Sequence, residues 1–348
     1  MNIRHIHAFI LFTIVCLPFI FISLSDSSPI ILLKMNHQFP SDTPGAKIDQ
    51  WFADEIKHKT NGHVQIRIFW SNRLGGPKEN LDLLSRGVID MAGMSAGYFP
   101  DEMPLLAAPN SLPMALDNVC QSSLLMKQLL KAVPEISMEA QALGIRPLFF
   151  HVLNPYLLVT KEPVTTLSQL QGKRLRTWGN DMADLVRAAG ATPVPLFLPD
   201  LFRAMETGVI DGCPFSVDLV VTYQIDKLAK HITNVVMWEG PSWGIWIGAA
   251  SWDKLSPAEQ DIFLQTAEEA RQKSITMSIQ AEKEAYQRLT QNGITFHSWP
   301  DQEIEKWKSN SPDFFSTFIK RMDHLGKGGA AREMVSLWRE IRLHSECP

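Results

Sequence analysis

Residues 172–218 constrain the fold most strongly, because this stretch reads as a strand, a helix, a second strand and a second helix in succession. Residues 173–178 alternate charged with apolar or β-branched side chains, as a short strand does. Asn180 stands in the N-cap position of a helix over residues 182–189, and the second helix ends at Gly208, just before the next strand. Strands that alternate with helices at this interval predict a parallel or mixed sheet.

Arg176 lies at the carboxyl end of the first of these strands. In open α/β sheets, ligands bind beyond the carboxyl ends of the strands. A guanidinium stays charged at every accessible pH, and its planar fork of donors fits a carboxylate with two parallel hydrogen bonds. The alternative is a surface arginine paired with an acidic side chain. The position favours a carboxylate-binding residue.

The tetrapeptide Gly-Val-Ile-Asp occurs twice, at residues 87–90 and 208–211, roughly 120 residues apart. Each copy follows an amphipathic helix and is followed by a turn or a run of small residues. A coincidental match is the alternative. We expect two α/β lobes built on the same plan, with a cleft between them, and a chain of 348 residues is long enough for two domains.

The first 27 residues have the pattern of a secretory signal peptide. Arg4 precedes an apolar run over residues 8–24, and polar residues follow the run. No A-x-A cleavage pattern is present, so an uncleaved N-terminal anchor is the alternative. Outside this leader, Cys120, Cys213 and Cys347 form an odd count, which leaves at least one free thiol in an oxidising compartment.

Several classes of function receive no support from the composition. The net charge is −4, without a basic tract, so nucleic-acid binding is not expected. The histidines are scattered without metal-ligand spacing, and neither a phosphate-binding loop nor a dinucleotide fingerprint is present. We therefore expect no metal, no cofactor and no catalytic residues.

Residues 93–97 spell G-x-S-x-G, the nucleophile-elbow pattern of α/β-hydrolases, with Ser95 as the serine. An elbow serine sits between a strand and a helix that starts at once, but residues 98–104 contain two prolines that oppose a helix. A secreted hydrolase is the alternative that this motif leaves open. We favour a ligand-binding loop, in which small residues let backbone donors approach a bound anion.

One long helix is predicted near the C-terminus. Residues 256–259, Ser-Pro-Ala-Glu, form a capping box with proline in the first turn, and helix-forming residues continue without a breaker to Gln291. At 1.5 Å per residue this helix reaches roughly 50 Å, which is longer than a single lobe is wide.

Short motifs in a fixed order resemble the solute-binding proteins of tripartite ATP-independent periplasmic (TRAP) transporters, the DctP family. The matches run from the start of the mature chain to about Gly212. They comprise residues 36–40, 74–79, 87–90 running into 95–99, 112–114, 172–176, 190–195 and 208–212.

This resemblance implies a two-lobed, periplasmic-binding-protein-like α/β fold, with a ligand cleft between the lobes and a long lobe-spanning helix. It also implies a periplasmic receptor that captures a small organic acid by lobe closure and delivers it to the small and large membrane subunits of a TRAP permease. A sensory receptor of the same fold is a further alternative. The expected segments are a signal peptide (1–27), lobe I (28–152), lobe II (153–240), and a crossover with the long helix and C-terminal helices (241–348).

The resemblance also implies a set of ligand-binding residues. Arg176 matches the family's carboxylate-binding arginine. Phe215 lies where some members have a hydrogen-bonding asparagine and Tyr156 where they have a second arginine, and both departures favour a smaller or more apolar carboxylate. The other candidates implied by the resemblance are Asn36, His37, Phe39, Ser95, Tyr98, Trp178, Asp218 and Trp243.

Overall fold

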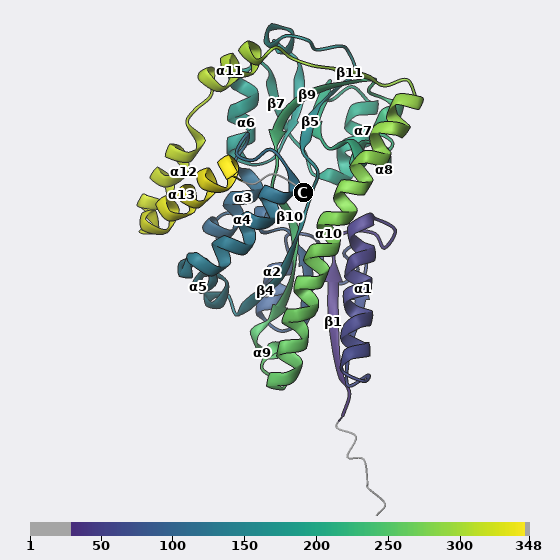
Figure 1. Ribbon diagram of the computed structural model, residues 1–348, viewed down its shortest axis with the longest axis vertical. Helices are drawn as coiled ribbons and strands as arrows, with labels where there is room; N and C mark the ends of the chain where they lie inside the picture. Colours follow the sequence, from purple (N-terminus) through teal and green to yellow (C-terminus); the bar gives the residue numbers. More distant parts are fainter. Residues whose placement is uncertain (1–28, 345–348) are drawn as a thin grey trace, which may run out of the picture.

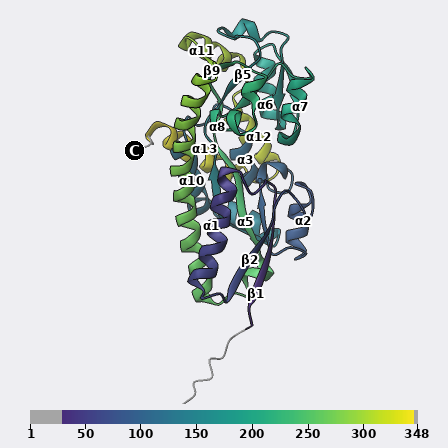
Figure 2. The same cartoon turned by 90° about the vertical axis from the view of Figure 1, so that its right-hand side faces the viewer.

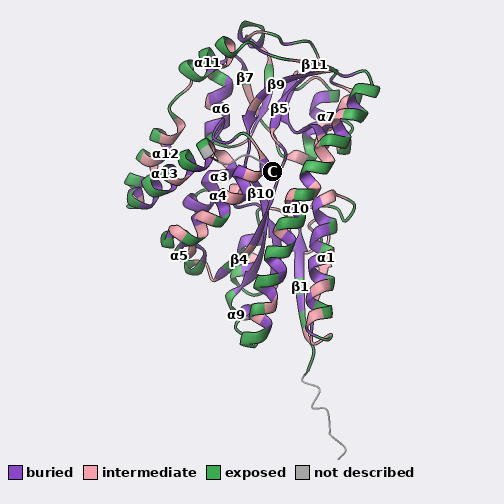
Figure 3. Ribbon diagram, viewed as in Figure 1, coloured by how far each residue is buried: buried purple, intermediate pink, exposed green. Residues whose placement is uncertain are grey.

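The computed structural model describes residues 29–344, so the predicted leader and Cys347 lie outside the described residues. The chain forms two sheets, one in each half of an elongated molecule (Figure 1). Buried residues concentrate on the strands and on the helix faces that cover them (Figure 3). Among residues 29–344, no helix is both long and apolar enough to cross a bilayer.

The first sheet has the strand order β2-β1-β3-β10-β4. β1 pairs in parallel with β2 and β3, whereas β10 runs antiparallel to β3 and β4. The strands are β1 (Ile31–His37), β2 (Val64–Phe69), β3 (Met91–Met94), β4 (Ile145–Val152) and β10 (Pro241–Gly248). The helices in this half are α1 (Pro44–Lys59), α2 (Asn80–Ser85), α3 (Pro104–Ser111), α4 (Val119–Ala132), α5 (Pro134–Ala142) and α9 (Ala249–Trp252).

The second sheet has the strand order β11-β9-β5-β8-β6-β7. β6 pairs in parallel with β7 and β8, and β5 runs antiparallel to β8 and β9, which confirms the predicted mixed sheet. The strands are β5 (Tyr156–Thr160), β6 (Arg174–Thr177), β7 (Thr192–Pro195), β8 (Gly212–Phe215), β9 (His231–Trp238) and β11 (Thr295–His297). The helices are α6 (Gly179–Ala188), α7 (Leu201–Glu206), α8 (Val217–Thr222) and α11 (Asp301–Asn310).

Two short connections join the sheets, one between β4 and β5 and one between β9 and β10. We propose that lobes I and II divide at these connections, after residues 152 and 240. The last helices, α12 (Phe314–His324) and α13 (Gly328–His344), pack into the core of lobe I, where Phe318 and Trp338 are buried. Trp307 of α11 is instead buried in the core of lobe II.

The predicted long helix is confirmed as α10 (Pro257–Gln291), which runs beside both lobes (Figures 1 and 2). It packs on α1, α4 and β4 of lobe I and on α8 of lobe II. The Ser256 hydroxyl accepts a hydrogen bond from the Glu259 amide, and the Glu259 carboxylate accepts one from the Ser256 amide.

Ser256→Ala is expected to lower the free energy of unfolding by about 1 kcal/mol, because it leaves an amide of the first helical turn without its acceptor. Thr276→Ala, at an exposed position inside the same helix, is the control and should leave stability unchanged or slightly higher. Urea denaturation measures both. Equal stability of the Ser256 variant and wild type would contradict the role of the cap.

The two Gly-Val-Ile-Asp copies form the same turn in the two lobes. Gly87 and Gly208 have φ angles of 69° and 75°, in the left-handed region that favours glycine. Each aspartate then joins the turn to one residue of a neighbouring strand. The aspartate amide donates to the backbone carbonyl of that strand residue, and the aspartate carboxylate accepts from the amide of that strand residue. The pairs are Asp90 with Lys34 and Asp211 with Arg174. Each tetrapeptide precedes its strand, so the predicted strand start at Val209 was two to three residues early.

Two other local predictions were wrong. The proline-flanked residues 109–113 were expected to form a loop, but Pro109 lies inside α3, because burial of almost the whole segment outweighs the local preference of proline. Asn180 does not cap α6. The N-cap is Trp178, whose side chain does not cap the helix, and Gly179 at φ 60° begins the helix.

The cysteine prediction is confirmed in its main point. Cys213 on β8 is a buried free thiol, and burial raises its pKa to about 12. The thiol is therefore unreactive at neutral pH. Cys120 is disulfide-bonded.

Candidate functional site

A cavity of about 330 Å³ lies between the two lobes. Its walls come from loops after strands of both sheets and from the end of α3, as the strand-end rule for open sheets predicts. Its lining includes Phe39, Ser95, Tyr98 and Asn110 from lobe I, and Tyr156, Arg176, Trp178, Phe197 and Trp238 from lobe II.

Arg176 is the main charged group of this cavity. Its side chain is buried, with a residue exposure of 7%, and its Nε donates to the Leu196 carbonyl at 3.2 Å. The guanidinium carbon lies 5.0 Å from the centre of the Trp178 ring. Nη1 is buried without a hydrogen-bond partner, and no carboxylate of residues 29–344 forms an ion pair with this arginine. A buried, unpaired cation is unfavourable unless an anion joins it, so the geometry favours binding of an anion.

Other polar groups that line the cavity also lack partners. Buried, unpartnered atoms include the Thr177 hydroxyl, the Trp238 indole nitrogen and the Gln38 side-chain oxygen. Buried polar groups are nearly always hydrogen-bonded in folded proteins. A cluster of such groups around one cavity suits the binding of a polar molecule.

Three of the chain's four tyrosines, Tyr98, Tyr156 and Tyr223, gather near Arg176. Burial raises the pKa of each hydroxyl, to about 12 for Tyr223, and the Arg176 charge only partly opposes this rise. The hydroxyls are therefore protonated donors at neutral pH. None of them hydrogen-bonds to another residue in the part of the chain that the structure describes.

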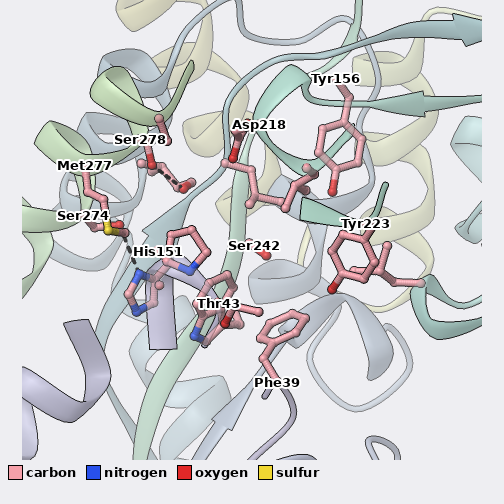
Figure 4. A pocket seen from close by; sticks show the side chains of 18 residues that line it. Phe39, Thr43, His151, Tyr156, Asp218, Tyr223, Ser242, Ser274, Met277 and Ser278 are labelled. Carbon is pink, nitrogen blue, oxygen red and sulfur yellow. Dashed lines mark hydrogen bonds between the residues drawn. The ribbon is translucent and has the colours of Figure 1, made fainter. Parts of the chain in front are cut away.

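A smaller cavity of about 60 Å³ adjoins the larger one (Figure 4). The two share five lining residues: Phe39, Leu153, Tyr156, Leu198 and Ser242. The smaller cavity extends between α8 and α10, where Asp218, Tyr223, His151, Trp243 and Met277 line it. The interlobe space is therefore one large chamber with a side chamber.

Asp49 is buried behind the lobe I wall of the side chamber and accepts hydrogen bonds from side chains of that wall. Its carboxylate accepts from His37 Nε2 at 2.8 Å, His151 Nε2 at 2.7 Å and Trp243 Nε1 at 3.3 Å. All four side chains are buried. Burial alone would raise the Asp49 pKa, but the charge and hydrogen bond of His151, followed by those of His37, lower it well below its usual range. The carboxylate is therefore ionised and holds the rings that face the chamber.

Most of the site residues expected from sequence line one of these cavities. Phe39, Ser95, Tyr98, Tyr156, Arg176 and Trp178 line the larger one, and Phe39, Tyr156, Asp218 and Trp243 line the side chamber.

Neither cavity is lined by Asn36, His37 or Phe215. Each of the three instead contacts residues next to the cavities. Asn36 hydrogen-bonds to Asn80, to the Gly75 carbonyl and to the Leu74 amide, and so holds the loop that carries Lys78. His37 binds Asp49, whereas Phe215 packs edge-on against the rings of Tyr156 and Tyr223.

Several lining residues escaped the sequence analysis, among them Tyr223, His151, Phe197, Lys78 and Asn110. A signal for Asp49 was present. An aspartate between Ile48 and Phe52, on the buried face of an amphipathic helix, requires a partner. The partners themselves lie far apart in sequence, which only the fold reveals.

The hydrolase motif does not assemble an elbow. Ser95 has φ −90° and ψ 128°, an ordinary extended conformation, and a single 3₁₀ turn (Ala96–Tyr98) follows it. No histidine of residues 29–344 hydrogen-bonds to Ser95, and Gly93 instead packs closely on the His37 ring. Within the same range, no group of three or more acidic, histidine or cysteine side chains could hold a metal ion.

The family model for bacterial extracellular solute-binding proteins, family 7 (DctP), matches residues 35–320. The chain belongs to this family. A curated relative is the C4-dicarboxylate-binding periplasmic protein DctP of Rhodobacter capsulatus, 24% identical over 80% of this chain and 83% of that protein. A solute-binding protein of Roseobacter denitrificans is 25% identical over 70% of this chain and 74% of that protein.

Solved structures of DctP-family proteins share the fold. An open TRAP periplasmic solute-binding protein from Desulfovibrio salexigens superposes with a TM-score of 0.80 at 20% identity, covering 91% of this chain and 97% of that one. The pyroglutamic acid receptor DctP7 of Bordetella pertussis superposes with a TM-score of 0.77 at 21% identity, covering 88% of this chain and 99% of that one. A galacturonate-bound TRAP solute-binding protein from Sulfitobacter superposes with a TM-score of 0.75 at 18% identity, covering 89% of this chain and 99% of that one. The predicted two-lobed α/β fold is confirmed.

Proposed function

We propose that this DctP-family protein is a periplasmic receptor that binds a small organic carboxylate at Arg176 and delivers it to the small and large membrane subunits of a TRAP permease. The observation that carries the proposal is the buried Arg176 guanidinium, which faces the interlobe cavity without a protein carboxylate. The ligands of these similar proteins, a C4-dicarboxylate, galacturonate and pyroglutamic acid, are all acids and support the same class.

Lobe closure is the proposed mechanism of capture. The Phe197 ring of lobe II packs edge-on against the Tyr98 ring of lobe I, with 5.8 Å between the ring centres. The Lys78 Nζ atom of lobe I lies 5.4 Å from the centre of the same Phe197 ring. The Trp178 indole donates to the Asn110 carbonyl across the cleft at 2.9 Å. An acid that pairs with Arg176 and touches both walls would stabilise a closed arrangement of the lobes over an open one, in proportion to its differential affinity.

The family's role as solute-binding proteins supports a receptor and not an enzyme. We propose export to the periplasm on the basis of the predicted leader and the periplasmic location of the DctP relative. The chemistry required of the site is reversible ion pairing and hydrogen bonding. Arg176, the tyrosine hydroxyls and Thr177 supply it without a covalent step.

A thermal-shift screen of the protein without its first 27 residues tests the receptor proposal. The panel contains small carboxylates, the amide of each acid, and neutral sugars. A ligand that binds only the folded state raises Tm by mass action, so at least one acid should raise Tm while its amide does not. Stabilisation by neutral compounds alone would contradict the arginine site.

Tyr156→Phe is expected to weaken binding of such an acid about 2- to 12-fold, because one neutral hydrogen bond contributes about 0.5–1.5 kcal/mol. Tyr286→Phe is the matched control, since Tyr286 packs on Phe296 at the lobe II end of α10 and lines neither cavity. Calorimetric Kd values for both variants check the expectation. Equal losses in the two variants would contradict a contact with Tyr156.

A further inference from the structure

Two opposite charges face the joined cavities without pairing with each other. Arg176 lines the larger cavity, and Asp218 lines the side chamber. Neither an ion pair nor a hydrogen bond connects them, and Asp218 pairs with no lysine or arginine of residues 29–344. Its carboxylate accepts from Asn154 Nδ2 at 3.0 Å. The cleft therefore has a positive end and a negative end, both available to a bound molecule.

Two further carboxyl groups, those of Glu239 and Glu282, lie near Asp218. Glu239 is fully buried in the turn between β9 and β10, and neither of its carboxyl oxygens has a hydrogen-bond partner among the described residues. Burial, followed by the charges of Glu282 and Asp218, raises the Glu239 pKa well above its usual range. Burial also raises the pKa of Asp218, and that of Glu282, where the Asp218 charge adds to the effect. A cation placed at Asp218 would relieve this accumulation of carboxyl groups, whereas a second anion would aggravate it.

The side chamber has walls suited to a cation. Aromatic rings of Phe39, Tyr156, Tyr223 and Trp243 line it together with Asp218 (Figure 4). Aromatic faces attract ammonium and quaternary ammonium groups through their quadrupoles. Tyr156 lines both cavities. Burial has the largest effect on its pKa and raises it, whereas the charge of Arg176 lowers this pKa and the charge of Asp218 raises it. Arg176 and Asp218 therefore both lie near this one tyrosine.

We propose that the ligand is a zwitterion, with its carboxylate at Arg176 and its cationic nitrogen in the aromatic side chamber beside Asp218. This inference rests on the proposed carboxylate receptor and narrows its substrate class. It disfavours dicarboxylates, because their second carboxylate would lie beside the Asp218 carboxylate without a cation to pair with it.

Matched pairs of ligands that differ in the charged nitrogen test the proposal. The pairs are glycine betaine with 3,3-dimethylbutanoate, proline with cyclopentanecarboxylate, and 4-aminobutanoate with pentanoate. Calorimetry on the mature protein gives Kd for each. We expect the zwitterion to bind about tenfold or more tightly than its carbon analogue in at least one pair.

Asp218→Asn is the diagnostic variant, because it removes the charge, keeps the shape and retains an oxygen that can accept from Asn154. It should abolish the advantage of the zwitterion while affinity for the carbon analogue stays equal or increases. Asp226→Asn is the control, as Asp226 hydrogen-bonds to Asn292 on the surface of the same lobe and should leave all affinities unchanged. The unfolding temperature of each variant without ligand verifies that the fold is intact.

The outcomes separate the two proposals. If the carbon analogues bind as tightly as the zwitterions, or if Asp218→Asn retains the zwitterion advantage, the inference is overturned and the carboxylate receptor stands. If neither member of any pair binds but an acid of the thermal-shift screen does, the inference is overturned and the carboxylate receptor stands. If no acid of that screen binds either, both proposals are contradicted.

Discussion

Arg176→Ala is expected to weaken carboxylate binding by a factor of about 10 to 150, because a hydrogen bond between charged groups contributes about 1.5–3 kcal/mol. Arg176→Lys should give an intermediate loss, since it keeps the charge but replaces the planar fork by a single ammonium group. Kd values from calorimetry, with an acid selected in the thermal-shift screen, measure both variants.

The stability of the same variants separates a binding role from a structural one. In the unliganded protein Arg176 is a buried cation without a carboxylate, so its removal should change the free energy of unfolding by no more than about 1 kcal/mol. Arg174→Ala is the control, because Arg174 lies two residues earlier on β6 and pairs with Asp211 at the surface. Its Kd should equal that of wild type. Unchanged affinity in Arg176→Ala would eliminate the arginine from the site.

Asp49→Ala is expected to lower the free energy of unfolding by about 3–5 kcal/mol, the usual effect of removing one partner from a buried charged pair. The variant leaves the facing nitrogens of His37, His151 and Trp243 without their acceptor. Asp54→Ala, at an exposed position of the same helix, should change stability far less. Guanidinium denaturation at neutral pH compares the two variants, and equal losses would contradict the role assigned to the network.

The pH dependence of stability gives a second test of Asp49. Its pKa is lowered in the folded state, so the stabilisation is fully present above the unfolded value of about 4 and is lost progressively as pH falls below it. The difference in stability between wild type and Asp49→Ala should therefore shrink in acid. A difference that stays constant from pH 6 to pH 2 would contradict ionisation of Asp49.

The sequence predicted those features that depend on local chemistry. A capping box and an uninterrupted run of helix-forming residues specify both the start and the length of α10. The repeated Gly-Val-Ile-Asp turns indicated two lobes because left-handed glycine and a clipping aspartate are needed wherever the turn recurs. Arg176 stood out because a strand end in an open sheet is a ligand position.

Features that depend on distant contacts were not predictable in this way. Asp49 gathers side chains from β1, β4 and β10, and the third tyrosine of the site, Tyr223, follows a short helix without any distinctive motif. Pro109 shows the same limit at the level of secondary structure, since burial of the surrounding segment outweighs its local preference.

The tryptophans around the cleft have an optical consequence. Trp178 lies beneath the Arg176 guanidinium, and Trp238 lines the same cavity while Trp243 lines the side chamber. Indole emission responds to nearby charge and to exclusion of water, so an arriving ligand would alter the intrinsic fluorescence of the protein. Stopped-flow measurement of this emission, without any added dye, would follow both the encounter with a ligand and the proposed closure of the lobes.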